Sequence, residues 1–311
     1  MSARACLAVD SACDLPTAFL QEHAIKILPI NLKIGSGIYR DTRDPAHTIK
    51  LYKSKQLEED FSAESEPASQ QEISSFIESE LASDYDEVLA LTISSQRSGV
   101  YKNIRESAFV ERRRLKEVRQ KQGNTVPFKI RVVDSAALFT GQGVLAFEVI
   151  RLMKEGKLSH SEIVKHIESL KSKTRALLVP NSLYFLKNRA RAKGDNSVSW
   201  LSYKLGNMMD IKPIVQGYKG ITEPIAKVRG YDEGIKFLFK RAEDAIDKGL
   251  AIPVVVMSYA GDPRQIENLE IYQQFVARVK KKGITPLLSI MSTTGAINVG
   301  PGSFSLAYAD D

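Results

Sequence analysis

Residues 88–101 read Val-Leu-Ala-Leu-Thr-Ile-Ser-Ser-Gln-Arg-Ser-Gly-Val-Tyr, a mostly apolar run followed by polar residues. An acidic segment, residues 84–87, precedes the run, and Ser94 and Ser95 follow it. Because the run does not alternate between apolar and polar residues, it is typical of a strand that helices cover on both faces. The serines then predict the start of a helix.

Similar short runs alternate with helical patterns through the rest of the first half. Cys6–Val9 and Lys129–Val133 are typical of strands, and a helix is expected at about residues 140–154. This alternation predicts an α/β fold whose N-terminal domain holds a doubly wound, mostly parallel sheet. The polar stretches 53–74 and 120–125 are expected to be connections.

The second half has a different pattern. Its strand-like runs are mixed with helices and include a hairpin-like turn at residues 217–220, and an amphipathic helix is expected over 231–246. This mixture predicts a smaller C-terminal α+β domain. We expect a boundary near Ser172, which gives domains of residues 1–172 and 173–311.

Composition places the chain among ordinary globular proteins: of its 311 residues 43% are hydrophobic and 26% are charged. Disordered, collagen-like and coiled-coil classes are excluded. No apolar stretch approaches the roughly 20 residues that a membrane-spanning helix needs. The two cysteines, Cys6 and Cys13, fit neither a C-x-x-C motif nor a zinc site. We therefore expect no metal site and a reducing, cytoplasmic location.

The charge is basic, with 44 Lys+Arg against 37 Asp+Glu, a net charge of +7. The one local run is Glu111–Lys121, which holds six basic and two acidic residues. No aromatic residue interleaves with it, so a solvated helix face is the favoured interpretation. A nucleic-acid or phospholipid surface is the alternative.

Three serines gather where the central strand gives way to a helix: Ser94, Ser95 and Ser98. Hydroxyls and free backbone N–H groups at a helix N-terminus can bind a carboxylate or phosphate. Asp10–Asp14 and Val133–Ser135 follow two other predicted strands. In a doubly wound sheet these loops share one edge, where ligands usually bind. A turn at Asn298–Gly302 is a further candidate.

Catalytic motifs are weak by comparison. Gly141-x-Gly143-x-x-Ala146 matches the dinucleotide fingerprint, but it does not follow its strand immediately, so helix packing is favoured. No G-x-S-x-G elbow or Walker A loop occurs, and none of the four histidines lies in a glycine-rich or apolar setting. Binding is thus favoured over catalysis. A dinucleotide- or phosphosugar-binding enzyme that uses the same loops remains the alternative.

Taken together, the motifs resemble the DegV family of fatty-acid-binding proteins over essentially the whole chain. Each piece is short, and their order and spacing carry the resemblance. The matching segments, in order, are Asp10–Pro16, Pro29–Asp41, Ile93–Tyr101, Val133–Ser135, Gly141–Gly143, Leu183–Leu186, Leu205–Pro213, Lys227–Arg229 and Val299–Gly302.

The resemblance implies a long-chain fatty acid, or a similar anionic lipid, held in an internal apolar tunnel. The protein would present the carboxylate to a fatty acid kinase and would have no catalysis or cofactor of its own. Ser94, Ser95 and Ser98 would bond the carboxylate, and Arg229 would face the kinase. Transient contact with a membrane surface is compatible with this role, and nucleic acid is not an expected partner.

Two departures from the family pattern concern the carboxylate site. Glu64 stands where the family has a threonine, and Ser62 or Ser65 can replace that hydroxyl if the loop register differs. Asn298 stands where the family has a histidine, and it can donate a hydrogen bond but cannot become cationic. Glu64 must therefore point away, be protonated, or indicate a different head group.

Overall fold

The computed structural model describes residues 4–54, 57, 62–192 and 210–311. Its first sheet is four-stranded and parallel, in the order β2-β1-β6-β7. The strands are β1 (Ala5–Asp10), β2 (Lys26–Leu28), β6 (Glu87–Thr92) and β7 (Lys129–Asp134). The apolar run at residue 88 thus forms a central strand, and the expected parallel sheet is confirmed.

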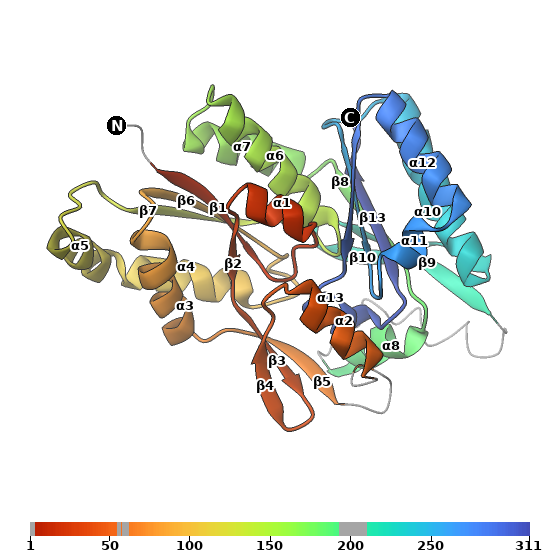
Figure 1. Ribbon diagram of the computed structural model, residues 1–311, viewed down its shortest axis with the longest axis horizontal. Helices are drawn as coiled ribbons and strands as arrows, with labels where there is room; N and C mark the ends of the chain where they lie inside the picture. Colours follow the sequence, from red (N-terminus) through yellow and green to blue (C-terminus); the bar gives the residue numbers. More distant parts are fainter. Residues whose placement is uncertain (1–3, 55–56, 58–61, 193–209) are drawn as a thin grey trace.

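Helices cover both faces of this sheet (Figure 1). Leu7 and Val9 pack against α6 (Gly141–Glu155) and α7 (His160–Leu170) on one face. Cys6 and Ala8, which alternate with them, pack on the other face. The helices on that second face are α3 (Gln70–Phe76), α4 (Val100–Val110) and α5 (Arg112–Lys121). The period-two alternation of a strand therefore divides its side chains between two helical layers.

The second sheet has six strands in the order β10-β9-β8-β13-β11-β12 and mixes parallel with antiparallel pairs. This arrangement confirms the expected second, α+β part of the fold. Its first strand begins at Thr174, and the domain division at residue 172 stays a prediction. The strands are β8 (Thr174–Val179), β9 (Ile211–Tyr218), β10 (Ile221–Arg229), β11 (Val254–Tyr259), β12 (Thr285–Ile290) and β13 (Phe304–Ala309).

A third, antiparallel sheet corrects one expectation. It has the order β4-β3-β5 and consists of β3 (Ile30–Ile34), β4 (Gly37–Arg40) and β5 (Ala63–Pro67). The stretch 53–74, expected to be a connection, contains β5 and most of α3. The sequence of β5, Ala-Glu-Ser-Glu-Pro, has little strand propensity, so pairing with β3 determines its conformation.

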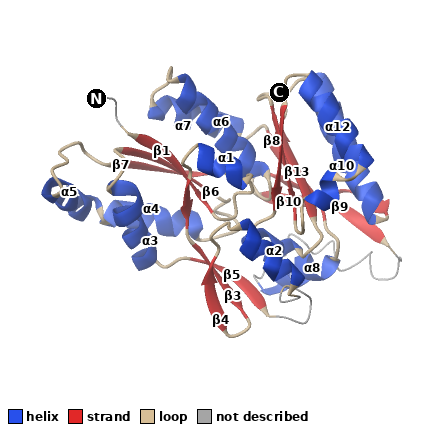
Figure 2. Cartoon of the chain, in the orientation of Figure 1, coloured by secondary structure: helices blue, strands red, loops and turns tan. Residues whose placement is uncertain are grey.

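Helix α6 lies between the two larger sheets, as Figure 2 shows. Residues of both sheets join it in one core. A Cβ added to Gly143 would lie 3.0 Å from the carbonyl oxygen of Asp14 and 3.0 Å from Val256 Cγ1. A Cβ on Gly141 would lie 3.2 Å from Ala137 Cβ. These glycines therefore allow α6 to pack closely against its neighbours. This is the role that the sequence favoured over a dinucleotide-binding motif.

The basic run forms α5, and one of its cations has a structural role. Arg119 is buried and forms a 2.6 Å ion pair with Asp86. Its guanidinium also donates to the backbone carbonyls of Ala82, Tyr85 and Val126. Arg119 is thus not available to a nucleic acid.

The remaining helices either pack against these sheets or connect them. Within the described ranges, no helix is both long and apolar enough to cross a membrane. The helices not yet named are α1 (Thr17–Glu22), α2 (Pro45–Lys53), the π-helix η1 (Ile77–Ala82), α8 (Leu183–Ala192), α10 (Tyr231–Lys248), α11 (Arg264–Glu267), α12 (Glu270–Lys281) and α13 (Thr293–Val299).

Candidate functional site

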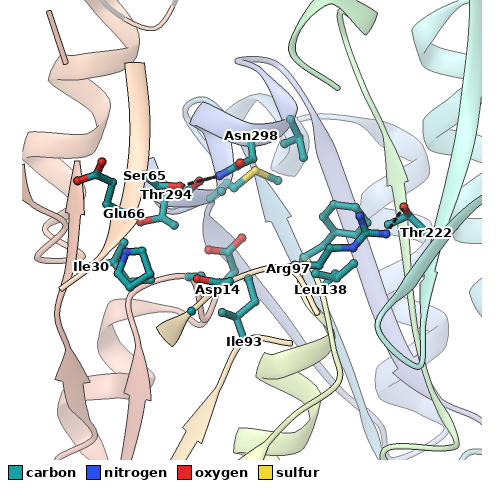
Figure 3. Close-up of a pocket in the computed structure, with 18 of the residues that line it drawn as sticks. Asp14, Ile30, Ser65, Glu66, Ile93, Arg97, Leu138, Thr222, Thr294 and Asn298 are labelled. Atoms are coloured by element: carbon teal, nitrogen blue, oxygen red, sulfur yellow. Dashed lines mark hydrogen bonds between the residues drawn. The ribbon is translucent and has the colours of Figure 1, made fainter. Parts of the chain in front are cut away.

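A cavity of about 330 Å³ lies where the three sheets meet, beside the carboxyl ends of β1, β6 and β7. Its volume falls at the lower end of the range for small-molecule sites, roughly 300–1,000 Å³. Its wall is mainly apolar, with polar groups at a few places (Figure 3). The lining residues are Ala12, Asp14, Ile30, Ser65, Glu66, Pro67, Ile93, Arg97, Ser98, Gly99, Leu138, Phe139, Leu186, Thr222, Met291, Thr294, Gly295, Asn298 and Val299.

Hydrogen bonds join the three carboxyl-edge loops that the sequence predicted to lie together. The backbone N–H of Ile93 donates to Asp10 Oδ2 at 2.6 Å. The N–H of Ser95 donates to Asp134 Oδ1 at 3.1 Å, and its hydroxyl donates to Asp134 Oδ2 at 2.5 Å. The N–H of Ser94 donates to the carbonyl of Ala137 at 3.1 Å. The aspartates that end β1 and β7 therefore fix the loop that follows β6.

The five ligand-binding residues expected from the sequence fall into two groups. Ser65, Ser98 and Asn298 line the cavity. Ser94 and Ser95 are not among its lining residues: Ser94 is fully buried, and Ser95 is exposed with its hydroxyl on Asp134. Contact of Ser94 and Ser95 with a ligand stays a prediction.

Ser65 and Ser98, called the hydroxyl pair below, have similar hydrogen bonding. Ser65 Oγ accepts a 3.1 Å hydrogen bond from Asn298 Nδ2, and Ser98 Oγ accepts a 3.4 Å bond from the N–H of Val100. Among the described residues, no acceptor takes the hydroxyl hydrogen of either serine. The segments that carry them are in contact, because a Cβ on Gly99 would lie 3.4 Å from Pro67 Cγ. The hydroxyl pair can therefore donate to an anion in the cavity.

The position of Glu64 resolves the departure noted in the sequence. Glu64 is exposed and is not a lining residue, so its carboxylate does not compete with an anion in the cavity. Its neighbour Glu66 does line the cavity and forms a 2.5 Å ion pair with Lys33. Lys33 thereby offsets the negative charge of Glu66.

Arg97 and Thr222 also line the cavity, and neither was among the ligand-binding residues predicted from the sequence. The guanidinium of Arg97 donates to Thr222 Oγ1 at 2.9 Å and to the carbonyl of Gly220 at 3.3 Å. Figure 3 shows this contact on the opposite side of the cavity from Ser65 and Asn298. Burial lowers the pKa of Arg97, although a guanidinium remains charged in proteins. The position of Arg97 within the serine-rich loop was the feature of the sequence from which its place at the cavity could have been predicted.

Buried carboxylates position the helix that carries Asn298. Asp41 accepts hydrogen bonds of 2.8 Å from both the N–H and the hydroxyl of Thr294 at the start of α13. Asp14 accepts from the N–H of Ser292 at 2.8 Å and forms a 3.1 Å ion pair with Arg43. Burial raises the pKa of Asp14, and the charge of Arg43 opposes that rise. Asp14 thus ties α13 to the first sheet, and Asp41 ties it to the small third sheet.

The backbone is strained at one wall of the cavity. Phe139, in the loop between β7 and α6, has a φ of 52°, in the left-handed region that non-glycine residues rarely occupy. Such strain is concentrated at functional sites, where the surrounding structure maintains it. Phe139 lines the cavity, which supports the assignment of this cavity as the functional site.

Two further expectations concern other parts of the chain. Arg229 is exposed at the end of β10 and is not a lining residue of the cavity. In the part of the chain that the structure describes, no three His, Cys, Asp or Glu side chains are grouped so that they could hold a metal ion.

Comparison with known proteins finds relatives in sequence and in structure, and they agree with one another on the family. A DegV domain-containing protein of Xanthomonas axonopodis pv. citri is 38% identical over 303 residues, which cover 97% of this chain and 96% of the relative. A crystal structure of DegV, described as a fatty acid binding protein from Bacillus subtilis, matches with a TM-score of 0.76 and 19% identity over 100% of both chains.

A stearic acid-binding protein from Eubacterium ventriosum also has a TM-score of 0.76, with 19% identity over 98% of this chain and 97% of that one. At such identities these structures establish the fold. The family model described as "Uncharacterised protein, DegV family" matches residues 6–311. Nearly the whole chain is therefore matched, and the protein belongs to the DegV family.

Proposed function

We propose that this protein binds a long-chain fatty acid in the cavity between its sheets. The observation that carries the proposal is that a mainly apolar wall and two serine hydroxyls with unused hydrogens line a single cavity. Structural neighbours described as fatty-acid-binding proteins support it. A fatty acid has the matching chemistry, an apolar chain with one anionic end.

The acyl chain would supply most of the binding free energy. Each buried methylene contributes about 0.8 kcal/mol, and the loss of translational, rotational and conformational freedom offsets part of the sum. The apolar side chains available to the chain are Ile30, Ile93, Leu138, Phe139, Leu186 and Met291.

The polar groups would orient the ligand. In this proposal the carboxylate accepts hydrogen bonds from the hydroxyl pair, Ser65 and Ser98, while Asn298 holds the Ser65 hydroxyl as an acceptor. Hydrogen bonds to a charged group are roughly twice as strong as neutral ones. Arg97 adds a positive charge to the cavity wall and favours an anionic ligand over a neutral one.

We further propose a carrier role without catalysis or cofactor, in which the protein presents the carboxylate to a fatty acid kinase. Arg229, exposed at the end of β10, is then a residue of the kinase-facing surface. Exchange of the fatty acid with a lipid bilayer requires only transient contact with the membrane surface.

Native mass spectrometry of the purified protein tests the central claim. We expect a fraction carrying a bound acid of fatty-acid mass, and tight binding of oleate or palmitate to delipidated protein. A protein that is empty after purification, and that does not bind either acid in titration, would contradict the proposal. Stabilisation by NAD or sugar phosphates alone would instead favour the nucleotide or phosphosugar alternative.

A further inference from the structure

Apolar side chains are exposed next to the most basic helix of the chain. Phe109 and Val110, the last two residues of α4, are 67% and 71% exposed. The next helix, α5, presents Arg113 and Lys116 to solvent. The side chain of Arg113 is 93% exposed and forms a 3.4 Å ion pair with Glu117, which is itself exposed. Exposed apolar side chains are not needed beside a basic helix that is simply solvated. Their position next to the cations of α5 therefore indicates a binding partner that has both apolar and anionic groups.

Two adjoining hollows extend the same surface. They have volumes of about 550 and 450 Å³, lie between α4, α5 and β7, and share Ala108 and Ile130. Five of their six charged lining residues are basic, and two of these five are ion-paired: the buried Arg119 with Asp86, and Lys129 with Glu87. These six are Arg105, Glu106, Lys116, Arg119, Lys129 and Arg131. Because β7 is an edge strand of the first sheet, no further strand among the described residues covers this side of that sheet.

We infer that this surface, the α4–α5 face, docks on an anionic phospholipid membrane. The α4–α5 face consists of Phe109, Val110, Arg105, Arg113 and Lys116. Interfacial helices of peripheral proteins insert large apolar side chains among lipid head groups while neighbouring cations bind the anionic lipids. A nucleic acid would use the cations but would leave Phe109 and Val110 exposed to water. The membrane accounts for both sets of side chains.

Helix α4 connects this face to the ligand cavity. Ser98 and Gly99, which immediately precede α4, line the cavity, whereas Phe109 and Val110 end the helix. The 11 residues of α4 span about 16 Å. Figure 1 shows α5 at the outer end of the molecule, beyond α4. The inference rests on the proposed function in one respect, since a fatty-acid carrier must reach the bilayer that dissolves its ligand.

Co-sedimentation of the full-length protein with lipid vesicles tests this inference. We expect binding to phosphatidylcholine vesicles that contain phosphatidylglycerol, and weaker binding to pure phosphatidylcholine or at high salt. The double variants Phe109→Ser with Val110→Ser, and Arg113→Glu with Lys116→Glu, are each expected to weaken binding by about fivefold or more. All four positions are exposed, so the fold is expected to persist, which circular dichroism checks.

Matched controls come from exposed positions elsewhere on the chain. Ile38→Ser removes an apolar side chain that is 69% exposed on β4, and Lys240→Glu reverses a cation whose side chain is 70% exposed on α10. Both controls are expected to bind vesicles as the unaltered protein does. Equal binding by the controls and by both double variants would overturn the inference.

Two other outcomes separate the alternatives. If only the charge reversal weakens binding, and duplex DNA displaces the protein from vesicles, the face is a nucleic-acid surface and the inference fails. Oleate binding without vesicles is expected to be the same in all variants. If the unaltered protein binds oleate but does not bind vesicles, this inference alone is overturned. If it binds vesicles but does not bind oleate, only the proposed function is contradicted.

Discussion

Asn298 on α13 donates a 3.1 Å hydrogen bond from its Nδ2 to the Oγ of Ser65 on β5. The same Nδ2 donates to the carbonyl of Thr294 at 2.7 Å, so the position of the amide within its own helix is fixed. Since Ser65 Oγ accepts from Asn298, the hydrogen of Ser65 remains for another acceptor. The contact thus joins the small sheet to α13 and prepares a donor beside the cavity.

Removing the hydroxyl pair tests that donor role. We expect Ser65→Ala with Ser98→Ala to weaken oleate binding by roughly a hundredfold or more, because each of the two hydrogen bonds to a charged group contributes about 1.5–3 kcal/mol. Isothermal titration calorimetry on delipidated protein provides the measurement. Unchanged affinity would show that neither hydroxyl contacts the carboxylate.

The matched comparison is Ser94→Ala with Ser95→Ala, at the two predicted positions that do not line the cavity. Ser95 donates its hydroxyl hydrogen to Asp134, so the loss of affinity is expected to be smaller than for the hydroxyl pair. A larger loss from this second pair would assign the carboxylate to the site expected from the sequence.

Arg97 is predicted to favour charged ligands. Arg97→Leu removes the positive charge from the cavity wall, and we expect it to weaken oleate binding by roughly tenfold while binding of oleyl alcohol changes little. The ratio of the two affinities, measured by competition, separates charge from packing. An equal loss for both ligands would mean that Arg97 acts through its contacts with Gly220 and Thr222.

The parallel sheet was predictable because its strands carry a local signal. The run at residues 88–93 is mostly apolar. A buried strand of this kind can be identified from its own residues, without knowing which strands it pairs with. The carboxyl-edge position of the site followed from the same pattern. Strand β5 was not predictable, because β3 determines its conformation through pairing between residues distant in sequence.

The cavity lining was only partly predictable for a related reason. Ser98 lies in the recognisable serine-rich loop, but Thr222 comes from an edge strand of the second sheet. Nothing in the local sequence of Thr222 indicates that Arg97 contacts it across 125 residues. Likewise, the serines of one loop have different roles for reasons that lie outside the loop: Ser94 is fully buried, and Asp134 takes the hydroxyl hydrogen of Ser95.

Gly143→Ala tests the assignment of the glycine motif to helix packing. The added Cβ would approach the carbonyl oxygen of Asp14 and Val256 Cγ1 to 3.0 Å, and neither neighbour belongs to the flexible end of a side chain. We expect the free energy of unfolding to fall by about 1–3 kcal/mol, as measured in urea. A variant of unaltered stability that loses binding of NAD would instead restore the dinucleotide interpretation.

The last prediction concerns the pH dependence of stability. Burial raises the pKa of Asp10 to about 7, and hydrogen bonds from the N–H groups of Ile93 and Ala12 oppose that rise. A carboxyl whose pKa is raised by folding binds more protons in the folded state, so its contribution to stability decreases as the pH rises toward 7.

We therefore expect the free energy of unfolding of the unaltered protein, relative to Asp10→Asn, to fall by roughly 2–3 kcal/mol between pH 5 and pH 8. Urea unfolding of both proteins at the two pH values gives this difference, in which the other carboxyls, Asp14 among them, cancel. Asn keeps an acceptor for one of the two N–H groups and does not titrate. The stability of the Asp10→Asn variant therefore depends on pH only through the other groups. A difference that stays constant would mean that Asp10 titrates at its ordinary pKa and that the loop after β6 does not keep it from water.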